Sequence, residues 1–415
     1  MLKWEMIVEE WQRYMKWVKR EVRVIVSGVF LLFLLKFVYD IALEKSNEPF
    51  FGSLSVLSGI TFAAGNFGYG QGDQPYVKGT SIVGRDAVKR FRDQLDCFSE
   101  SGRWVYDPTP RHIPWNYVGD AYTTVCEDRH RIRSSGVSDS MAEDIAVRGG
   151  ANDWSVREEL KWVWQTNSSC PWQSINRDTF CGKLGANGNV MIVGDSINHE
   201  IQWSLMNALI TNGSGYDRLS GSSTYNFAPY EMCTDIFGHG AGINVSFICN
   251  VHLTNITSAD SDTSIQQPWI YHLDEFDTKL LFLNTGAHFV EDEEYTRALR
   301  EAFTILTERY PHIHVIYRNT EPGHFDCMSH TKPLLAPQEE SRDGQFNSYH
   351  WVEFNQQNLL AKEIVEEFGY TYMDVYSMLS LRPEAHVSAS DCLHYCLPGP
   401  LDIAVEYLYN ILFLL

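Results

Sequence analysis

Ser196 is a candidate catalytic residue, because it ends the tripeptide Gly194-Asp195-Ser196 between an apolar run and a helical pattern. A serine at such a turn is exposed to substrate, and its N–H at a helix N-terminus can help to hold an oxyanion. Serine is a weak nucleophile at its ordinary pKa, so it needs an imidazole base and a carboxylate that fixes the imidazole tautomer. A serine that only caps the helix gives the same local pattern.

The candidate base and carboxylate stand near the other end of the chain, in Asp391-Cys392-Leu393-His394. An aspartate three residues before a histidine can share its face across one turn. The order Ser, Asp, His is that of α/β esterases and differs from the chymotrypsin order. Either motif alone carries little weight, whereas an accidental combination of the two is much rarer.

Strands and helices alternate from about residue 96 onward and must position these motifs. Apolar runs predict strands, and amphipathic patterns predict helices, in this order: strand 189–194, helix 200–209, strand 279–284, helix 291–310, strand 314–317, helix 354–368, strand 371–375 and helix 402–414. This alternation predicts an α/β fold with a parallel sheet covered by helices on both faces. Ligands of such sheets bind at the carboxyl ends of the strands, where Ser196 falls.

These motifs resemble those of the plant trichome-birefringence-like proteins. The closing block runs from Asp391 to Gly399 as Asp-Cys-Leu-His-Tyr-Cys-Leu-Pro-Gly, and Ser204-Leu205 follow the serine motif. Other blocks agree: Cys97 with Gly102-Arg103-Trp104-Val105, Trp162-x-Trp164 before Cys170, Asn284-Thr285-Gly286, and Arg318-Asn319-Thr320-x-Pro322-x-His324-Phe325. The resemblance covers residues 97–415. It implies a three-layer SGNH-hydrolase-like fold and a polysaccharide O-acetyltransferase of the PC-esterase group.

By this resemblance, Ser196 is the nucleophile, His394 the base and Asp391 its orienting carboxylate. The family blocks also suggest that Asn284 and Gly286 line the site as oxyanion donors, with packing at a strand end as the alternative.

The turn residues Gly194 and Asp195 are further candidates for oxyanion or substrate contact. Plant members usually continue the serine motif with Leu-x-Arg-Asn-Gln, whereas this chain has Ile197-Asn198-His199-Glu200-Ile201. His199 therefore stands where an arginine is usual, and the change bears on handling of the acetyl donor, the oxyanion or the substrate.

Several other functions are disfavoured. The chain of 415 residues has a net charge of −20, which argues against nucleic acid as a partner. We expect no metal site, because His312-x-His314 lacks a third ligand at a suitable spacing. Trp162, Trp164 and Trp172 could stack on sugar rings, although tryptophans near cysteines are more often part of a core.

The first 43 residues differ from the rest: seven basic and five acidic residues give +2, which leaves 26 basic and 48 acidic residues, or −22, for residues 44–415. Residues 1–21 predict an amphipathic cytosolic helix and residues 22–43 an uncleaved transmembrane signal anchor. A signal-peptide core and a buried helix are the alternatives. The basic residues lie on the N-terminal side of this anchor, so the positive-inside rule places the part of the chain after the anchor on the luminal side of the membrane. Residues 44–96 form a stem, and residues 97–415 form the luminal enzyme domain.

Sequons and cysteines support a luminal body. The sequons begin at Asn167, Asn212, Asn244 and Asn255, all beyond the anchor. Nine cysteines also lie beyond it, at long spacings that predict four disulfides and one free thiol, which we expect at Cys249. These features indicate a single-pass type II protein of the Golgi or another secretory-pathway membrane.

The expected function is transfer of an acetyl group to a glycan or polysaccharide hydroxyl through an acetyl-Ser196 intermediate. The acetyl donor would be a co-substrate such as acetyl-CoA, and no bound cofactor is expected. Two alternatives stay open: an acetyl-esterase with the same triad and water as acceptor, and a noncatalytic glycan-binding protein of the same fold.

Overall fold

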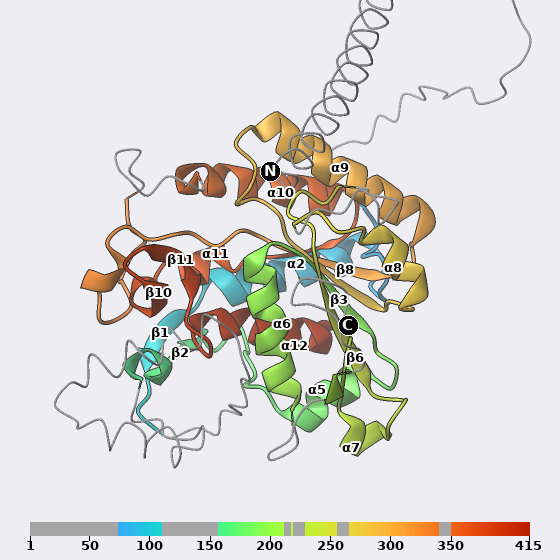
Figure 1. The fold of residues 1–415 in the computed structure, drawn as a ribbon, viewed down its shortest axis with the longest axis horizontal. Coiled ribbons are helices and arrows are strands. Elements are labelled where there is room, and N and C mark those ends of the chain that lie inside the picture. Colours follow the sequence, from blue (N-terminus) through green and yellow to red (C-terminus); the bar gives the residue numbers. More distant parts are fainter. Residues whose placement is uncertain (1–73, 110–156, 211–216, 219–228, 255–264, 340–349) are drawn as a thin grey trace, which may run out of the picture. The chain divides into compact units, whose positions relative to one another are not determined.

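Seven strands form the central sheet of this protein, whose computed structural model describes residues 74–109, 157–210, 217–218, 229–254, 265–339 and 350–415 (Figure 1). The strand order across the sheet is β4-β5-β6-β3-β7-β8-β9. Their bounds, in that order, are Asp217–Arg218, Tyr230–Met232, Ile243–Cys249, Val190–Gly194, Leu280–Leu283, His314–Arg318 and Thr371–Met373. The four predicted strands correspond to β3, β7, β8 and β9.

The sheet is mixed, which corrects the prediction of a wholly parallel sheet. Strands β6, β3, β7, β8 and β9 are parallel, whereas β5 pairs antiparallel with β6 and β4 antiparallel with β5. The connection from β5 to β6 covers only residues 233–242, with the short helix α7 (Thr234–Phe237). A parallel crossover needs a dozen or more residues, so β5 and β6 pair antiparallel.

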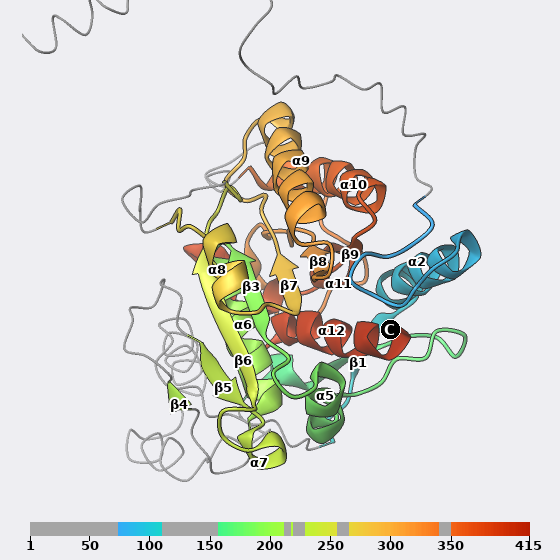
Figure 2. The same cartoon turned by 90° about the vertical axis from the view of Figure 1, so that its right-hand side faces the viewer.

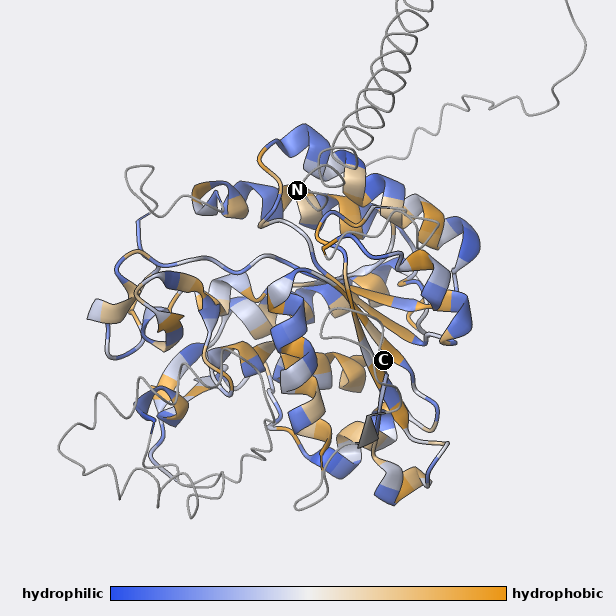
Figure 3. Ribbon diagram, viewed as in Figure 1, coloured by the Kyte–Doolittle hydropathy of each residue, from blue (hydrophilic) through white to orange (hydrophobic). Residues whose placement is uncertain are grey.

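Helices cover both faces of the sheet, as predicted (Figure 2). The α6 face carries α2 (Arg85–Glu100), α5 (Arg177–Leu184), α6 (Ser196–Leu209) and α12 (Ile403–Leu414). The α9 face carries α8 (Ile270–Glu275), α9 (Asp292–Arg309) and the C-terminal half of α10 (Trp351–Glu367). Central strand β3 alternates between the two cores, with Val190 and Ile192 in one and Met191 and Val193 in the other. Figure 3 shows the sheet strands as mainly hydrophobic and much of α9 as hydrophilic.

Helix α2 runs across the expected boundary between stem and enzyme domain. Its side chains Val88, Phe91, Leu95 and Phe98 recur at steps of three and four and are buried in the core of the α6 face. This amphipathic spacing belongs to a helix packed on a domain. Residues 85–100 are therefore packed on the enzyme domain instead of belonging to a stem.

Two antiparallel strand pairs lie outside the main sheet. One pairs β1 (Arg103–Tyr106) with β2 (Trp162–Gln165), and the other is a hairpin of β10 (His386–Ser388) and β11 (Asp391–Tyr395). In the first pair, Trp164 Nε1 donates to the main-chain oxygen of Phe98, and Trp104 Nε1 donates to that of Met378. These bonds give both tryptophans a packing role.

Disulfides join Cys97 to Cys170, Cys181 to Cys233 and Cys327 to Cys392 among the described residues. Cys249 is free and buried at the end of β6, which confirms the prediction for the odd thiol. Its burial, together with the nearby Asp195 carboxylate, raises the thiol pKa to about 12, so the group stays protonated.

The predicted anchor, residues 22–43, lies outside the described residues, as do Asn212 and Asn255. Among the described helices, none has the length and apolar character needed to cross a bilayer. Asn167 is exposed in a turn, where its Oδ1 accepts from Ser169, whereas Asn244 lies half-buried in β6 and donates to Asn189 Oδ1 at 2.9 Å. A glycan is easier to attach at Asn167 than at Asn244.

Candidate active site

Ser196 is the first residue of α6 and directly follows the turn at the carboxyl end of β3. It is half-buried, whereas every neighbour from Val190 to Asp195 and from Ile197 to Ile201 is buried. As a first-turn residue, its N–H has no acceptor within the helix. The turn therefore exposes both a hydroxyl and an amide, the two groups that an acyl-transfer nucleophile needs.

Gly194 and Asp195 shape this turn. A Cβ at Gly194 would come within 2.6 Å of Asn198 Nδ2 and 2.7 Å of the Asn284 main-chain oxygen, so only glycine fits. The Asp195 carboxylate is buried and caps α6, accepting from the N–H groups of Ile197 at 3.0 Å and Asn198 at 3.4 Å. Asp195 is thus a capping residue, and substrate contact is not needed to explain it.

Ser196, His394 and Asp391 form one hydrogen-bonded chain. Ser196 Oγ lies 2.7 Å from His394 Nε2, and His394 Nδ1 lies 2.9 Å and 3.0 Å from the two Asp391 carboxylate oxygens. The sequence separation between serine and histidine is 198 residues, so the fold brings them together. In this arrangement the carboxylate fixes the proton on Nδ1 and leaves Nε2 to accept the serine proton.

The Asp391 carboxylate is held ionised. Its half-burial alone would raise the pKa, but the hydrogen bond and charge of His394 and the N–H groups of His394 and Leu393 outweigh that effect. The result is an Asp391 pKa lowered to about 2. The carboxylate therefore stays charged at any pH where the protein would work.

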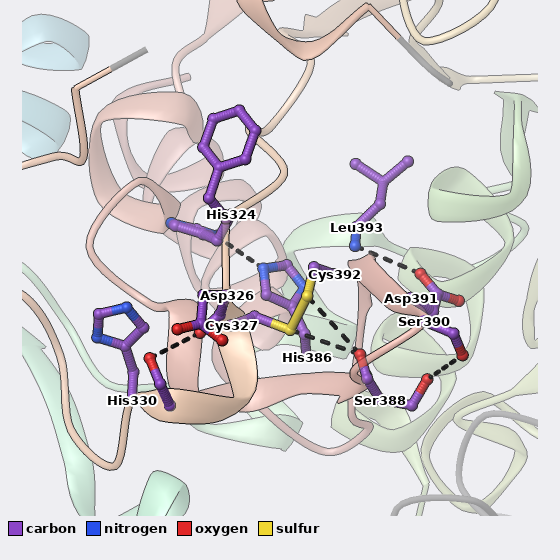
Figure 4. Close-up of a disulfide and its surroundings, with 12 residues drawn as sticks. His324, Asp326, Cys327, His330, His386, Ser388, Ser390, Asp391, Cys392 and Leu393 are labelled. Carbon is purple, nitrogen blue, oxygen red and sulfur yellow. Dashed lines mark hydrogen bonds between the residues drawn. A yellow bond between two sulfur atoms is a disulfide. The ribbon is translucent and has the colours of Figure 1, made fainter. Parts of the chain in front are cut away.

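A disulfide and a pair of histidines hold the hairpin that carries Asp391 and His394. The Cys327–Cys392 disulfide fastens β11 to the segment after β8, and Figure 4 shows Ser388 and Asp391 of the hairpin beside it. His386 Nδ1 lies 3.0 Å from the main-chain oxygen of His394, and its Nε2 lies 2.7 Å from His324 Nδ1. His324 thus supports His386, which in turn contacts the main chain of His394.

A buried arginine supports the Ser196 turn. Arg318, at the end of β8, is fully buried and donates to Asn198 Oδ1 from Nε at 3.1 Å and from Nη2 at 3.0 Å. Asn198 in turn donates to the main-chain oxygen of Val193 at 2.7 Å. The guanidinium, which also pairs with Glu321, thereby ties the first turn of α6 to the end of β3.

Asn284 and Gly286 lie beside the turn, but their side-chain positions are used for packing. Asn284 Nδ2 donates to the main-chain oxygen of Arg318 at 3.0 Å and to Thr320 Oγ1 at 3.2 Å. A Cβ on Gly286 would overlap the same Thr320 hydroxyl. No hydrogen bond among the described residues joins Asn284 to the triad, so these contacts favour strand-end packing over oxyanion binding for the pair.

His199 lies between α6 and β6. Its ring stacks near Phe247 with centroids 4.8 Å apart, and its Nε2 accepts from Trp203 Nε1 at 3.2 Å. Burial lowers its pKa to about 4, so the imidazole is neutral. The residue that replaces the usual arginine therefore lies buried between Phe247 and Trp203.

Three residues near the triad were not assigned a role from the sequence: Asn198, His252 and His288. His288 follows a predicted strand by four residues, so the rule that ligands bind at carboxyl strand ends could have identified it. His252 was missed because β6 was not predicted as a strand. Asn198 gave no sequence signal, since only its bond to Arg318 reveals its function.

Residues 285–411 match the model of the PC-Esterase family, described as a GDSL/SGNH-like acyl-esterase family found in Pmr5 and Cas1p. This confirms the resemblance drawn from the motifs.

Similar proteins include trichome birefringence-like 20 of Arabidopsis thaliana, 30% identical over 31% of this chain and 31% of that protein. Trichome birefringence-like 25 of the same plant is 23% identical over 74% of this chain and 76% of its own length. Xylan O-acetyltransferase 7 of Oryza sativa subsp. japonica is 21% identical over 75% of this chain and 59% of its own length. The chain thus spans less than a third of the length of the first of these relatives.

Among solved structures, the periplasmic domain of a lipopolysaccharide acetyltransferase from Salmonella ser. Paratyphi A matches with a TM-score of 0.36 and 15% identity, covering 56% of this chain and 87% of that one. A mutant acetyl-xylooligosaccharide esterase from Geobacillus Stearmophilus matches with a TM-score of 0.32 and 16% identity, over 55% and 96%.

Proposed function

We propose that this protein is an enzyme that transfers an acetyl group to a hydroxyl of a glycan or polysaccharide through an acetyl-Ser196 intermediate. The observation that carries the proposal is the hydrogen-bonded chain from Ser196 Oγ through His394 to Asp391. The PC-Esterase match and the similarity to a xylan O-acetyltransferase support acetyl chemistry on carbohydrate.

The reaction takes place in two balanced steps. Ser196 Oγ attacks the acetyl carbonyl of a donor such as acetyl-CoA while His394 Nε2 takes the serine proton and passes it to the departing thiolate. In the second step His394 takes the proton of the acceptor hydroxyl, whose oxygen attacks the acetyl-serine carbonyl. Ser196 Oγ leaves and recovers that proton, which regenerates the free triad.

Backbone amides hold the tetrahedral oxyanion in both steps. The N–H of Ser196 is the amide that the turn leaves without a helical acceptor. Preorganised donors of this kind typically contribute about 10²- to 10³-fold in rate.

Acetyl transfer by the full chain tests the proposal. Wild type, Ser196→Ala and the exposed-serine control Ser81→Ala are incubated with acetyl-CoA and a panel of xylohexaose, mannohexaose and oligogalacturonide. Wild type and Ser81→Ala should yield acetylated oligosaccharide, and Ser196→Ala should yield none while melting at an unchanged temperature. Undiminished acetylation by Ser196→Ala would exclude the mechanism.

Hydrolysis by the same triad is the second candidate, supported by the acyl-esterase description of the matching family. Acetylated xylohexaose incubated with the enzyme, with and without unacetylated acceptor, separates the two reactions. A transferase moves the acetyl group to the added acceptor, whereas an esterase releases acetate at the same rate in both mixtures.

We also propose that residues 22–43 anchor the protein in the Golgi or another secretory-pathway membrane, with the enzyme domain in the lumen. The disulfides and the exposed Asn167 sequon support this placement. Protease protection in sealed microsomes tests it. Digestion of the Cys181–Cys233 region without detergent would contradict it.

A further inference from the structure

Two loops flank the Ser196 turn, because β6 and β7 are the two neighbours of β3 in the sheet. The loops are residues 250–254 after β6 and 284–289 after β7. All their residues are buried except His252, Thr254 and His288. Each loop therefore presents one half-buried histidine at the sheet edge where Ser196 lies.

Hydrogen bonds fix the tautomer of His252. Thr254 Oγ1 donates to Gln266 Oε1 at 3.1 Å, which turns the Gln266 amide nitrogen toward His252 Nδ1. Since Nδ1 accepts from Gln266, the proton of His252 lies on Nε2, which donates to the main-chain oxygen of His288 at 3.3 Å. Both ring nitrogens of His252 are thus engaged with protein groups.

The main chain around His288 is held on several sides. Thr285 Oγ1 donates to the main-chain oxygen of Val251 at 2.5 Å, which joins the two loops. Phe289 packs edge-on against the His252 ring with centroids 4.9 Å apart, and Gln357 Nε2 donates to the Phe289 main-chain oxygen at 3.1 Å. The His288 side chain is therefore presented from a fixed backbone.

The His288 ring lies within electrostatic reach of Asp195, His252 and His394. Burial lowers the His288 pKa, Asp195 opposes that effect, and His252 and His394 add to it. An imidazole nitrogen can donate a hydrogen bond to a sugar hydroxyl or accept one from it.

We propose that His288 binds a hydroxyl of the acceptor sugar next to Ser196, and that His252 is a positioning residue that holds His288 for this contact. The inference rests on the proposed transfer reaction and names the residues that select its acceptor. In the first step His288 has no part, because the donor acetylates Ser196 before the acceptor is needed. It acts when the acceptor hydroxyl must reach the acetyl-serine carbonyl.

The test uses the full chain with three readouts: fluorophosphonate labelling of Ser196, hydrolysis of p-nitrophenyl acetate, and transfer from p-nitrophenyl acetate to xylohexaose, mannohexaose and oligogalacturonide. His288→Ala should raise the KM for the oligosaccharide that wild type acetylates roughly tenfold, the effect of losing one hydrogen bond. Labelling and p-nitrophenyl acetate hydrolysis should stay within about twofold, because the Ser196–His394 pair is intact.

Three variants sharpen the result. His288→Gln keeps a donor and an acceptor and should restore part of the acceptor KM, and His252→Leu should raise that KM less than His288→Ala does. His312→Ala changes an exposed histidine away from the site and should behave as wild type.

Other outcomes overturn the inference. If His288→Ala loses labelling together with transfer, the histidine supports the nucleophile and not the acceptor. If transfer is unchanged, His288 does not contact the acceptor. A wild type that labels but acetylates none of the oligosaccharides refutes the acceptor role along with transfer, and a wild type that does not label refutes the proposed function itself.

Discussion

The two ends of the candidate triad are built in different ways. Ser196 stands at the end of the central strand, where main-chain contacts, the Asp195 cap and the Arg318–Asn198 pair set its position. Asp391 and His394 stand on the β10–β11 hairpin, outside the seven-stranded sheet. There, a disulfide and the His324–His386 contact set the position.

Because the two regions are held differently, we expect changes in them to affect stability and catalysis to different degrees. The buried residues that hold the Ser196 turn, such as Asn198 and Arg318, are packed in the interior of the protein, so a change in one of them should weaken the whole fold. The hairpin is held by a covalent bond and a few polar contacts, so a change there can displace the base while the sheet stays folded. Each prediction below breaks or sharpens this contrast, beginning with the largest expected effect.

Replacing Asp391 by asparagine should slow fluorophosphonate labelling roughly 10⁴-fold, as loss of the orienting carboxylate does in other triads. The amide no longer fixes the His394 Nδ1 proton, while its shape preserves the hairpin. Melting temperature, measured in parallel, should change little. The control Asp326→Asn alters an exposed acid next to the same disulfide, and equal slowing by that variant would point to a general effect of charge.

Two matched double variants, each of which removes one disulfide, compare the hairpin with the rest of the fold. Cys327→Ala with Cys392→Ala and Cys181→Ala with Cys233→Ala open loops of 65 and 52 residues, so each should lower the free energy of unfolding by about 4 kcal/mol. Only the first pair is attached to the hairpin. Labelling of the folded protein should slow for that pair alone, and equal rates for both would show that the disulfide does not position His394.

Asn198→Ala weakens the nucleophile end. It removes the acceptor of two bonds from the buried Arg318 guanidinium, which should lower the free energy of unfolding by about 2–3 kcal/mol. Denaturant unfolding measures this loss. The exposed helix position Asn355→Ala serves as a control, and an equally small change in both variants would contradict a structural role for the Arg318–Asn198 pair.

The buried His314 of β8 should make the stability of the sheet depend on pH in mild acid. Burial lowers the His314 pKa to about 4, and its Nε2 lies 3.0 Å from Thr371 Oγ1. Between pH 6.5 and 4 the unfolded chain binds a proton that the folded chain does not, so stability falls as the pH falls through this window. Between pH 7 and 5.5 the loss should be about 1 kcal/mol for this histidine.

His314→Gln cannot bind that proton, so its melting temperature should depend less on pH than that of wild type. His312→Ala, which changes the exposed neighbour, should keep the wild-type dependence. Identical pH slopes for His314→Gln and wild type would show that this histidine is not buried as a neutral ring.

Much of the sheet and the three triad positions could be predicted from the sequence. Apolar runs identified β3, β7, β8 and β9, because strands buried on both faces are continuously apolar. Gly194-Asp195-Ser196 and Asp391-x-x-His394 are local motifs, so their residues could be recognised without knowing how the chain brings them together.

The missed features depend on tertiary contacts. Strand β5 is three residues long, and its antiparallel direction follows from the short connection to β6. For Asn284 the sequence left oxyanion binding and strand-end packing open, and only the bonds of its amide to Arg318 and Thr320 favour packing. His199 replaces a charged residue of the family pattern but is enclosed by Phe247 and Trp203, which no periodicity reveals.

The most direct test of the central claim is the mass of the Ser196 peptide after brief exposure of the full chain to p-nitrophenyl acetate and acid quenching. The account predicts an acetyl group on Ser196 in wild type, much less of it in Asp391→Asn, and none in Ser196→Ala. An active enzyme whose Ser196 peptide never carries acetyl, or whose acetyl group is on another residue, would contradict it.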